Sequence, residues 1–150
     1  MVLRWFVATL HLAALPLGLA AIWLRGSALR GSLDSGSWKR ALAADNAWGA
    51  SALLWIGTGV WRAFGGLEKG TAYYIAQPVF HAKLGLVALI LLLEVWPMAT
   101  LVRARIALKR GEPIDPAPAR VIAAISRVQA ALVVLTMCAA TALARGTFGR

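Results

Sequence analysis

The chain is organised around residues 62–83, which read RAFGGLEKGTAYYIAQPVFHAK. This stretch holds three basic residues, one acid, one histidine and two tyrosines, and a long apolar run lies on either side of it. Ionisable side chains at this density are unfavourable inside hydrocarbon. We therefore expect its central part, residues 65–77, to connect two membrane-spanning helices.

The composition of the whole chain also indicates a membrane protein. Apolar residues make up 60% of the 150 residues and charged residues 15%, whereas soluble domains have about half and about a quarter. A domain this small has too much surface to bury so many apolar side chains. The single cysteine, Cys138, excludes an internal disulfide framework. The net charge of +10 does not indicate nucleic acid, because the basic residues gather in short connections between apolar runs.

Four apolar runs predict a single domain, residues 1–150, with an all-α fold: an up-down four-helix bundle integral to the membrane. Each run is long enough to cross about 30 Å of hydrocarbon at about 1.5 Å per residue. The predicted spans are residues 5–24, 43–64, 78–102 and 119–144.

The second run has recognisable start and packing signals. Asp45 or Asn46 is the expected N-cap, since short polar side chains bond the free N–H groups of a first turn. Small residues let helix backbones approach closely in membranes. We expect this role for Gly49, Gly57 and Gly59.

The distribution of Lys and Arg predicts the orientation. The first and third connections are richer in basic residues than the opposite side of the predicted bundle. Loops of this kind face the cytoplasm. We therefore expect a multi-pass protein of the bacterial inner (cytoplasmic) membrane, with both termini and residues 62–83 on the periplasmic side.

Ionisable residues inside the runs need partners, because a charge at the bilayer centre costs about 3 kcal/mol. Glu94 in the third run and Arg127 in the fourth lie at similar depth, so we expect a buried ion pair between them. The pair either sets helix register alone or carries protons or substrate. Lys83 shares a helix face with Glu94, and it either points inward or extends to the outer headgroups.

The two histidines suggest a cofactor. His11 in the first run and His81 in the third lie at matched depth in parallel spans, and imidazoles on different helices can hold a b-type haem axially. The alternative is one hydrogen-bonded histidine inside the bundle and one among the headgroups. Haem binding requires that His81, rather than Lys83, faces the bundle, because residues two apart point in roughly opposite directions. Arg62 either extends outward or binds an anionic group, such as a porphyrin propionate or a lipid phosphate.

A set of motif residues carries a family resemblance: Arg62, Phe64, Lys69, Gly70, Tyr73, Tyr74, Pro78, Phe80, His81, Lys83, Leu84 and the closing Ala144-Arg145-Gly146. With them, the chain resembles a bacterial family of small four-span membrane proteins, the domain of unknown function 2214. The resemblance covers nearly the whole chain. It implies the fold and an inner-membrane location, and it implies no activity.

A second resemblance rests on His11, together with His81 and Lys83 at the start of the third run. This arrangement is similar to that of HemJ-type protoporphyrinogen oxidases and, more distantly, of CopD-like membrane domains. HemJ-type proteins are associated with b-haem and with electron removal from a porphyrinogen. The similarity implies a haem b-associated redox protein, a membrane oxidoreductase. His11 and His81 would then be the iron ligands, with Arg62 and Lys83 near the propionates.

Two other functions fit the same residues. One is a non-enzymatic accessory or structural subunit, within a homo-oligomer or a larger membrane complex, whose buried charges only fix packing. The other is a small proton-linked transporter that uses Lys83, Glu94 and Arg127. All these functions place the chain in contact with the lipid bilayer.

Overall fold

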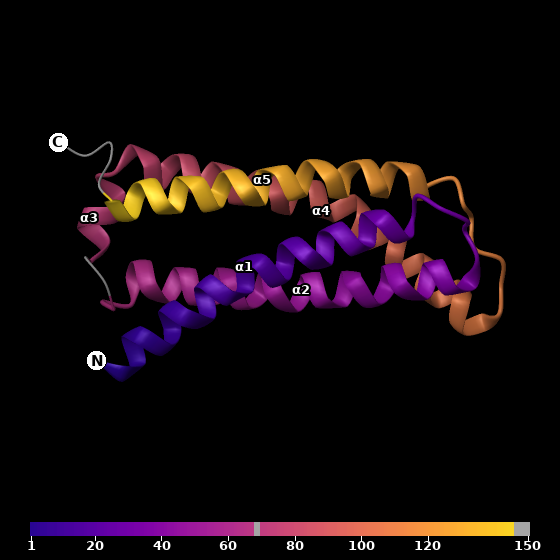
Figure 1. The fold of residues 1–150 in the computed structure, drawn as a ribbon, viewed down its shortest axis with the longest axis horizontal. Coiled ribbons are helices and arrows are strands. Elements are labelled where there is room, and N and C mark those ends of the chain that lie inside the picture. Colours follow the sequence, from indigo (N-terminus) through magenta and orange to yellow (C-terminus); the bar gives the residue numbers. More distant parts are fainter. Residues whose placement is uncertain (68–69, 146–150) are drawn as a thin grey trace.

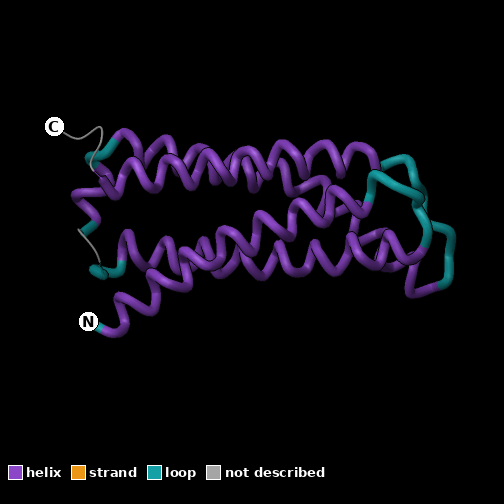
Figure 2. Tube along the Cα trace, viewed as in Figure 1, coloured by secondary structure: helices purple, strands orange, loops and turns teal. Residues whose placement is uncertain are grey.

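The computed structural model describes residues 1–67 and 70–145, and within these ranges the chain forms helices and no strand. The prediction of an all-α fold is therefore confirmed. The long helices lie side by side, with the N-terminus, the end of α5 and the short α3 at one end and the α1–α2 and α4–α5 connections at the other (Figures 1 and 2). The elements are α1 (Val2–Ala28), α2 (Ser35–Phe64), α3 (Thr71–Ile75), α4 (Pro78–Arg110) and α5 (Ala119–Arg145).

The outside of the bundle is apolar. Leu53 and Leu92 are 77% and 72% exposed, as expected of side chains that face hydrocarbon. Among the described residues, three helices are long and apolar enough to cross a membrane: α1, α4 and α5. α2 is not in this set, and its apolar stretch contains Gly, Ser, Thr, Trp and Arg62 as well as strongly apolar residues. Apolar membrane helices are thus confirmed, and the crossing by α2 stays a prediction.

α2 begins at Ser35 rather than at the predicted residue 43. Its N-cap is Asp34, whose carboxylate accepts a hydrogen bond from the Ser37 N–H at 2.6 Å. The expected cap at Asp45 or Asn46 is therefore wrong. The added turns are held by Trp38, which is 3% exposed and belongs to an apolar cluster at this end of the bundle.

α4 continues to Arg110, beyond the predicted end at residue 102. Pro78 lies in its first turn, where the missing N–H has no partner to lose. Gly111 ends the helix with a φ of 69°. The N–H groups of Gly111 and Glu112 then bond to the carbonyls of Leu108 and Ala107 at 3.3 and 3.0 Å, which is the Schellman pattern.

Close approach of α1 and α2 depends on a glycine of α1. A Cβ atom on Gly18 would lie 3.0 Å from the Trp48 ring, so any side chain there would push the helices apart. The glycines predicted for this role lie on α2, and they differ. A Cβ on Gly59 would meet His11 at 3.0 Å, whereas Gly49 and Gly57 face open space.

Candidate functional site

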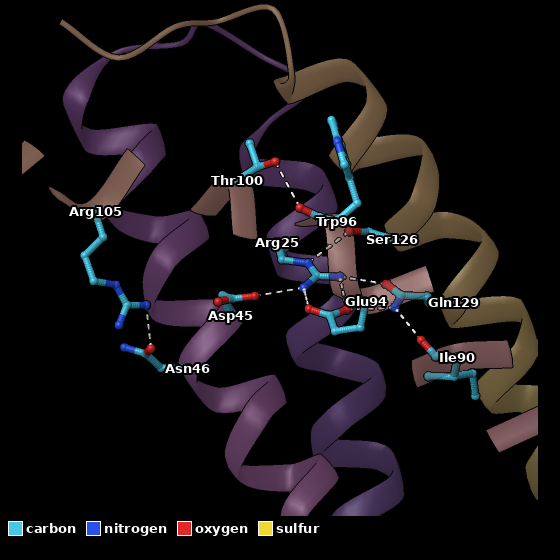
Figure 3. Close-up of polar contacts among 10 residues, drawn as sticks. All are labelled: Arg25, Asp45, Asn46, Ile90, Glu94, Trp96, Thr100, Arg105, Ser126 and Gln129. Carbon is cyan, nitrogen blue, oxygen red and sulfur yellow. Dashed lines mark hydrogen bonds and ion pairs between the residues drawn. The ribbon is translucent and has the colours of Figure 1, made fainter. Parts of the chain in front are cut away.

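A buried arginine links all the long helices of the bundle (Figure 3). Arg25, in the last turn of α1, is 0% exposed. Its Nη1 donates to Asp45 Oδ1 on α2 at 2.8 Å and to Glu94 Oε1 on α4 at 2.6 Å. Its Nη2 donates to Glu94 Oε2 at 3.0 Å and to Gln129 Oε1 on α5 at 2.6 Å. Its Nε donates to Ser126 Oγ at 3.1 Å, so all five N–H donors of the guanidinium are used.

Gln129 completes this group of residues, which we call the Arg25 cluster (Arg25, Asp45, Glu94, Ser126 and Gln129). Its amide donates to Glu94 Oε2 at 2.7 Å and to the Ile90 carbonyl at 3.1 Å. Buried ions are tolerated when their remaining polar atoms are hydrogen-bonded. Among the described residues, no buried side-chain nitrogen or oxygen lacks a partner.

The predicted pair of Glu94 with Arg127 is not formed. Arg127 is exposed, and Glu94 is paired with Arg25 instead. Arg127 lies at a suitable depth for this pair, because Gln129, two residues further along α5, does reach Glu94. Residues two apart on a helix point in roughly opposite directions. With Gln129 turned inward, Arg127 is therefore turned outward, and the predicted path through Lys83, Glu94 and Arg127 is not assembled.

Sequence reasoning missed Arg25 because the residue follows the apolar run and reads as a loop charge. A signal was present, however. The buried positions of α1 are spaced three or four residues apart, as on one face of a helix, and Arg25 continues that series. The series is His11, Ala14, Gly18, Ile22 and Arg25.

A cavity of about 430 Å³ lies at the opposite end of the bundle, beside α3. Two cationic residues, Arg62 and Lys83, line it. Tyr73 and Tyr74 of α3 also line it. The remaining lining residues are mostly apolar or small, and they come from α1, α2, α4 and α5: His11, Leu12, Leu15, Gly59, Ala63, Phe80, Met137, Ala140 and Thr141.

His11 is fixed at the wall of this cavity. Its Nδ1 lies 3.0 Å from the Trp55 carbonyl and 3.0 Å from Thr58 Oγ1. A carbonyl oxygen can only accept, so Nδ1 carries the proton. Thr58 is also an acceptor here, since its own hydroxyl donates to the Leu54 carbonyl at 2.6 Å. These contacts leave Nε2 of a neutral His11 as a hydrogen-bond acceptor.

His81 does not line the cavity. It is exposed, and its Nε2 donates to the Ile75 carbonyl at 2.8 Å. Lys83, on another side of the same helix, lines the cavity instead. His11 and His81 therefore do not converge, and the described residues do not fit the predicted axial pair for haem iron. Among these residues, no group of three or more His, Cys, Asp or Glu is placed to hold a metal ion.

Many of the motif residues gather around the cavity, although they are spread along the sequence. Arg62, Tyr73, Tyr74, Phe80 and Lys83 line it directly, whereas His81 does not. Lys69 and Gly146 lie outside the described residues. The others set the surrounding backbone or an adjoining wall: Gly70, with a φ of 86°, precedes α3, Pro78 begins α4, and Phe64 lines a neighbouring hollow.

That neighbouring hollow, of about 90 Å³, lies between α2 and α4. It shares His11, Gly59, Ala63, Phe80 and Lys83 with the cavity as lining residues. The hollow also contacts apolar side chains that are about half exposed on the outside of the bundle, namely Val60, Phe64 and Leu84. It is thus a groove that adjoins the cavity and reaches the apolar surface.

Comparison with protein-family models gives a match over residues 3–148, to the family described as "Predicted membrane protein (DUF2214)". No curated protein and no solved structure matches the chain.

Proposed function

We infer that this chain, which belongs to the DUF2214 family of predicted membrane proteins, binds an anionic amphiphilic molecule in the cavity beside α3. The observation that carries this proposal is the position of Lys83. Its side chain is partly buried and lines the cavity, and the described lining residues include no carboxylate.

The charge of the ligand follows from Lys83. Lys83 lines the cavity and forms no hydrogen bond or ion pair with another described residue. Arg62, which has an interaction of its own, is a second basic residue in the lining. A cation that is removed from water without a counter-ion is unfavourable. A bound phosphate or carboxylate would supply that counter-ion and would form strong, charge-assisted hydrogen bonds.

The apolar part of the ligand follows from the adjoining groove. A headgroup held by Lys83 in the cavity has an apolar path outward between α2 and α4, past Val60 and Leu84. Those side chains face the region that lipid tails would occupy. An amphiphile with one acyl-like tail fits this arrangement, because its headgroup and tail meet surfaces of matching polarity.

For an amphiphile to enter the cavity from the bilayer between α2 and α4, α2 must cross the membrane beside α1, α4 and α5. In this four-span arrangement the basic loops lie in the cytoplasm, and the cavity lies in the outer leaflet of the inner membrane. The end of the bundle with the α1–α2 and α4–α5 connections carries several basic residues, and this supports that orientation. They include Arg30, Lys39, Arg40 and Lys109.

Binding of matched probes to the purified protein in a neutral detergent tests the proposal. Dodecyl phosphate carries an anionic headgroup, dodecylphosphocholine carries a zwitterionic headgroup on the same tail, and inorganic phosphate has no tail. We expect dodecyl phosphate to bind most tightly. The Lys83→Gln variant should weaken that binding about tenfold, which corresponds to about 1.4 kcal/mol.

Lys39→Gln is the matched control, since Lys39 is an exposed lysine at the other end of the bundle. It should bind dodecyl phosphate like the native chain. Equal affinity for the two dodecyl probes, or no effect of Lys83→Gln, would overturn the anionic site. Inorganic phosphate that binds as tightly as dodecyl phosphate would overturn the role of the tail.

A structural accessory subunit is the second candidate, and the Arg25 cluster favours it. Every guanidinium donor there is already used by the protein, as a purely packing role requires. A stable complex with another membrane protein, unchanged by Lys83→Gln, would support this role. Haem binding stays a prediction from the sequence alone, and the cavity does not support it, since His81 is not among its lining residues.

A further inference from the structure

We propose that the Arg25 cluster is a proton-binding site, and that Asp45 is the carboxylate that holds the proton. This inference is independent of the cavity at the other end of the bundle. It rests on the number of charges in the cluster, on the distribution of its hydrogen bonds and on its place in the fold.

The cluster has one carboxylate more than its cations balance. Arg25 is positive, Asp45 and Glu94 are acidic, and Ser126 and Gln129 are neutral. With both acids ionised, the cluster carries a net negative charge between helices whose outer faces are apolar. Uncompensated charge is unfavourable in such surroundings. One added proton makes the cluster neutral.

The hydrogen bonds single out Asp45 as the site of that proton. Glu94 accepts three: Nη1 of Arg25 bonds to Oε1, and Nη2 of Arg25 and the Gln129 amide bond to Oε2. Asp45 accepts one, at Oδ1 from Nη1 of Arg25. No donor among the described residues reaches its Oδ2. A proton from water can therefore add to Oδ2, and no existing bond has to break.

The charged groups around Asp45 are few. Arg25 faces it from α1 and Glu94 from α4, and α5 presents only neutral side chains. Arg105 of α4 is the next cation, and it donates to Asn46 at 2.7 Å. In Figure 3 that contact lies away from Arg25, whereas Asp45 points toward Arg25. The side chain of Asp45 is 14% exposed, which leaves a route for exchange with water.

Infrared spectroscopy of the purified native protein at neutral pH tests this inference directly. A protonated carboxyl has a C=O stretch that an ionised carboxylate lacks. We expect this band at a pH at which the exposed Asp115 is ionised, since an ordinary aspartate has a pKa of about 3.9. The band should shift when aspartate carries a carbon-13 carboxyl label, and that readout needs no substitution.

Two variants locate the proton within the chain. Asp45→Asn should remove the band, because asparagine reproduces the neutral form and keeps the oxygen that accepts from Arg25. Asp115→Asn is the matched control and should retain it. The proposal is overturned if the native protein shows no such band, if the band shifts with labelled glutamate instead, or if it persists in Asp45→Asn.

Discussion

Arg25 and Glu94 are joined by two parallel hydrogen bonds, of 2.6 and 3.0 Å, that cross the diagonal of the bundle. α1 packs on α2 and α5, and α4 packs on the same two helices, so the pair joins helices that are not neighbours. Two-point contacts between guanidinium and carboxylate are directional as well as strong. The pair therefore fixes both the distance and the rotation of α1 relative to α4.

Replacing Glu94 by glutamine should destabilise the bundle by about 1.5 to 3 kcal/mol, the range for hydrogen bonds to charged groups. The amide offers one acceptor where the carboxylate offers two, and its NH₂ group meets donors from Arg25 and Gln129. Reversible unfolding in mixed detergent measures the change. Glu112→Gln is the control, since Glu112 is 54% exposed in a surface pair with Arg110. Equal losses in both variants would contradict this prediction.

Replacing Gly18 by leucine should destabilise the protein by about 1 to 3 kcal/mol, the usual effect of overpacking. A Cβ there already meets the Trp48 ring at 3.0 Å, and the Trp48 side chain is buried, at 4% exposed. Gly49→Leu is the matched control, because nothing lies within 4 Å of its Cβ. In the same unfolding measurement, the stability of Gly49→Leu should be close to that of the native chain. A stable Gly18→Leu variant would show that α1 and α2 are not in close contact.

The start of α2 should respond to acid through Asp34. The N–H of Ser37 bonds to this carboxylate and holds its pKa below the ordinary value. A lowered pKa means that the cap stabilises the helix above the ordinary pKa of about 3.9. The stabilisation is lost as the pH falls through the lower value of the folded state. The amide NMR shift of Ser37 should follow this titration. Asp34→Asn should abolish it, since asparagine can cap the helix without titrating.

Single cysteines should report the four-span arrangement. Cys138 is the one natural cysteine, so Cys138→Ser provides the background. A membrane-impermeant maleimide should label Ser32→Cys and Asp115→Cys only from the cytoplasmic side, and Thr71→Cys only from the opposite side. Labelling of Ser32→Cys and Thr71→Cys from the same side would show that α2 does not cross.

The apolar helices α1, α4 and α5 could be predicted from the sequence because lipid-facing helices are marked by long apolar runs. The early start of α2 could not, since residues 31–38 are rich in Gly and Ser and resemble a loop. Tertiary contacts override that local preference: Trp38 and Leu42 pack with Leu101 in a core cluster beyond the apolar run. Asp34 then caps a helix that composition alone would begin later.

The polar sites were harder to predict, because depth along a helix is easier to read from a sequence than rotation about it. Glu94 was correctly expected inside the bundle with a cationic partner, and the partner was wrong. Arg127 has a suitable depth and the wrong rotation, whereas Arg25 has the right rotation and follows the apolar run. The rotation of α4 likewise decides between Lys83 and His81: Lys83 lines the cavity, whereas His81 is exposed.

The most direct test of the account compares Arg25→Ala with Arg127→Ala by thermal unfolding in one detergent. Arg25→Ala removes the cation that Glu94 and Asp45 both contact, so it should lose about 3 to 5 kcal/mol, as when one partner of a buried pair is removed. Arg127→Ala removes an exposed side chain and should change stability by less than about 0.5 kcal/mol. The opposite order, or equal losses, would contradict a bundle held together at Arg25.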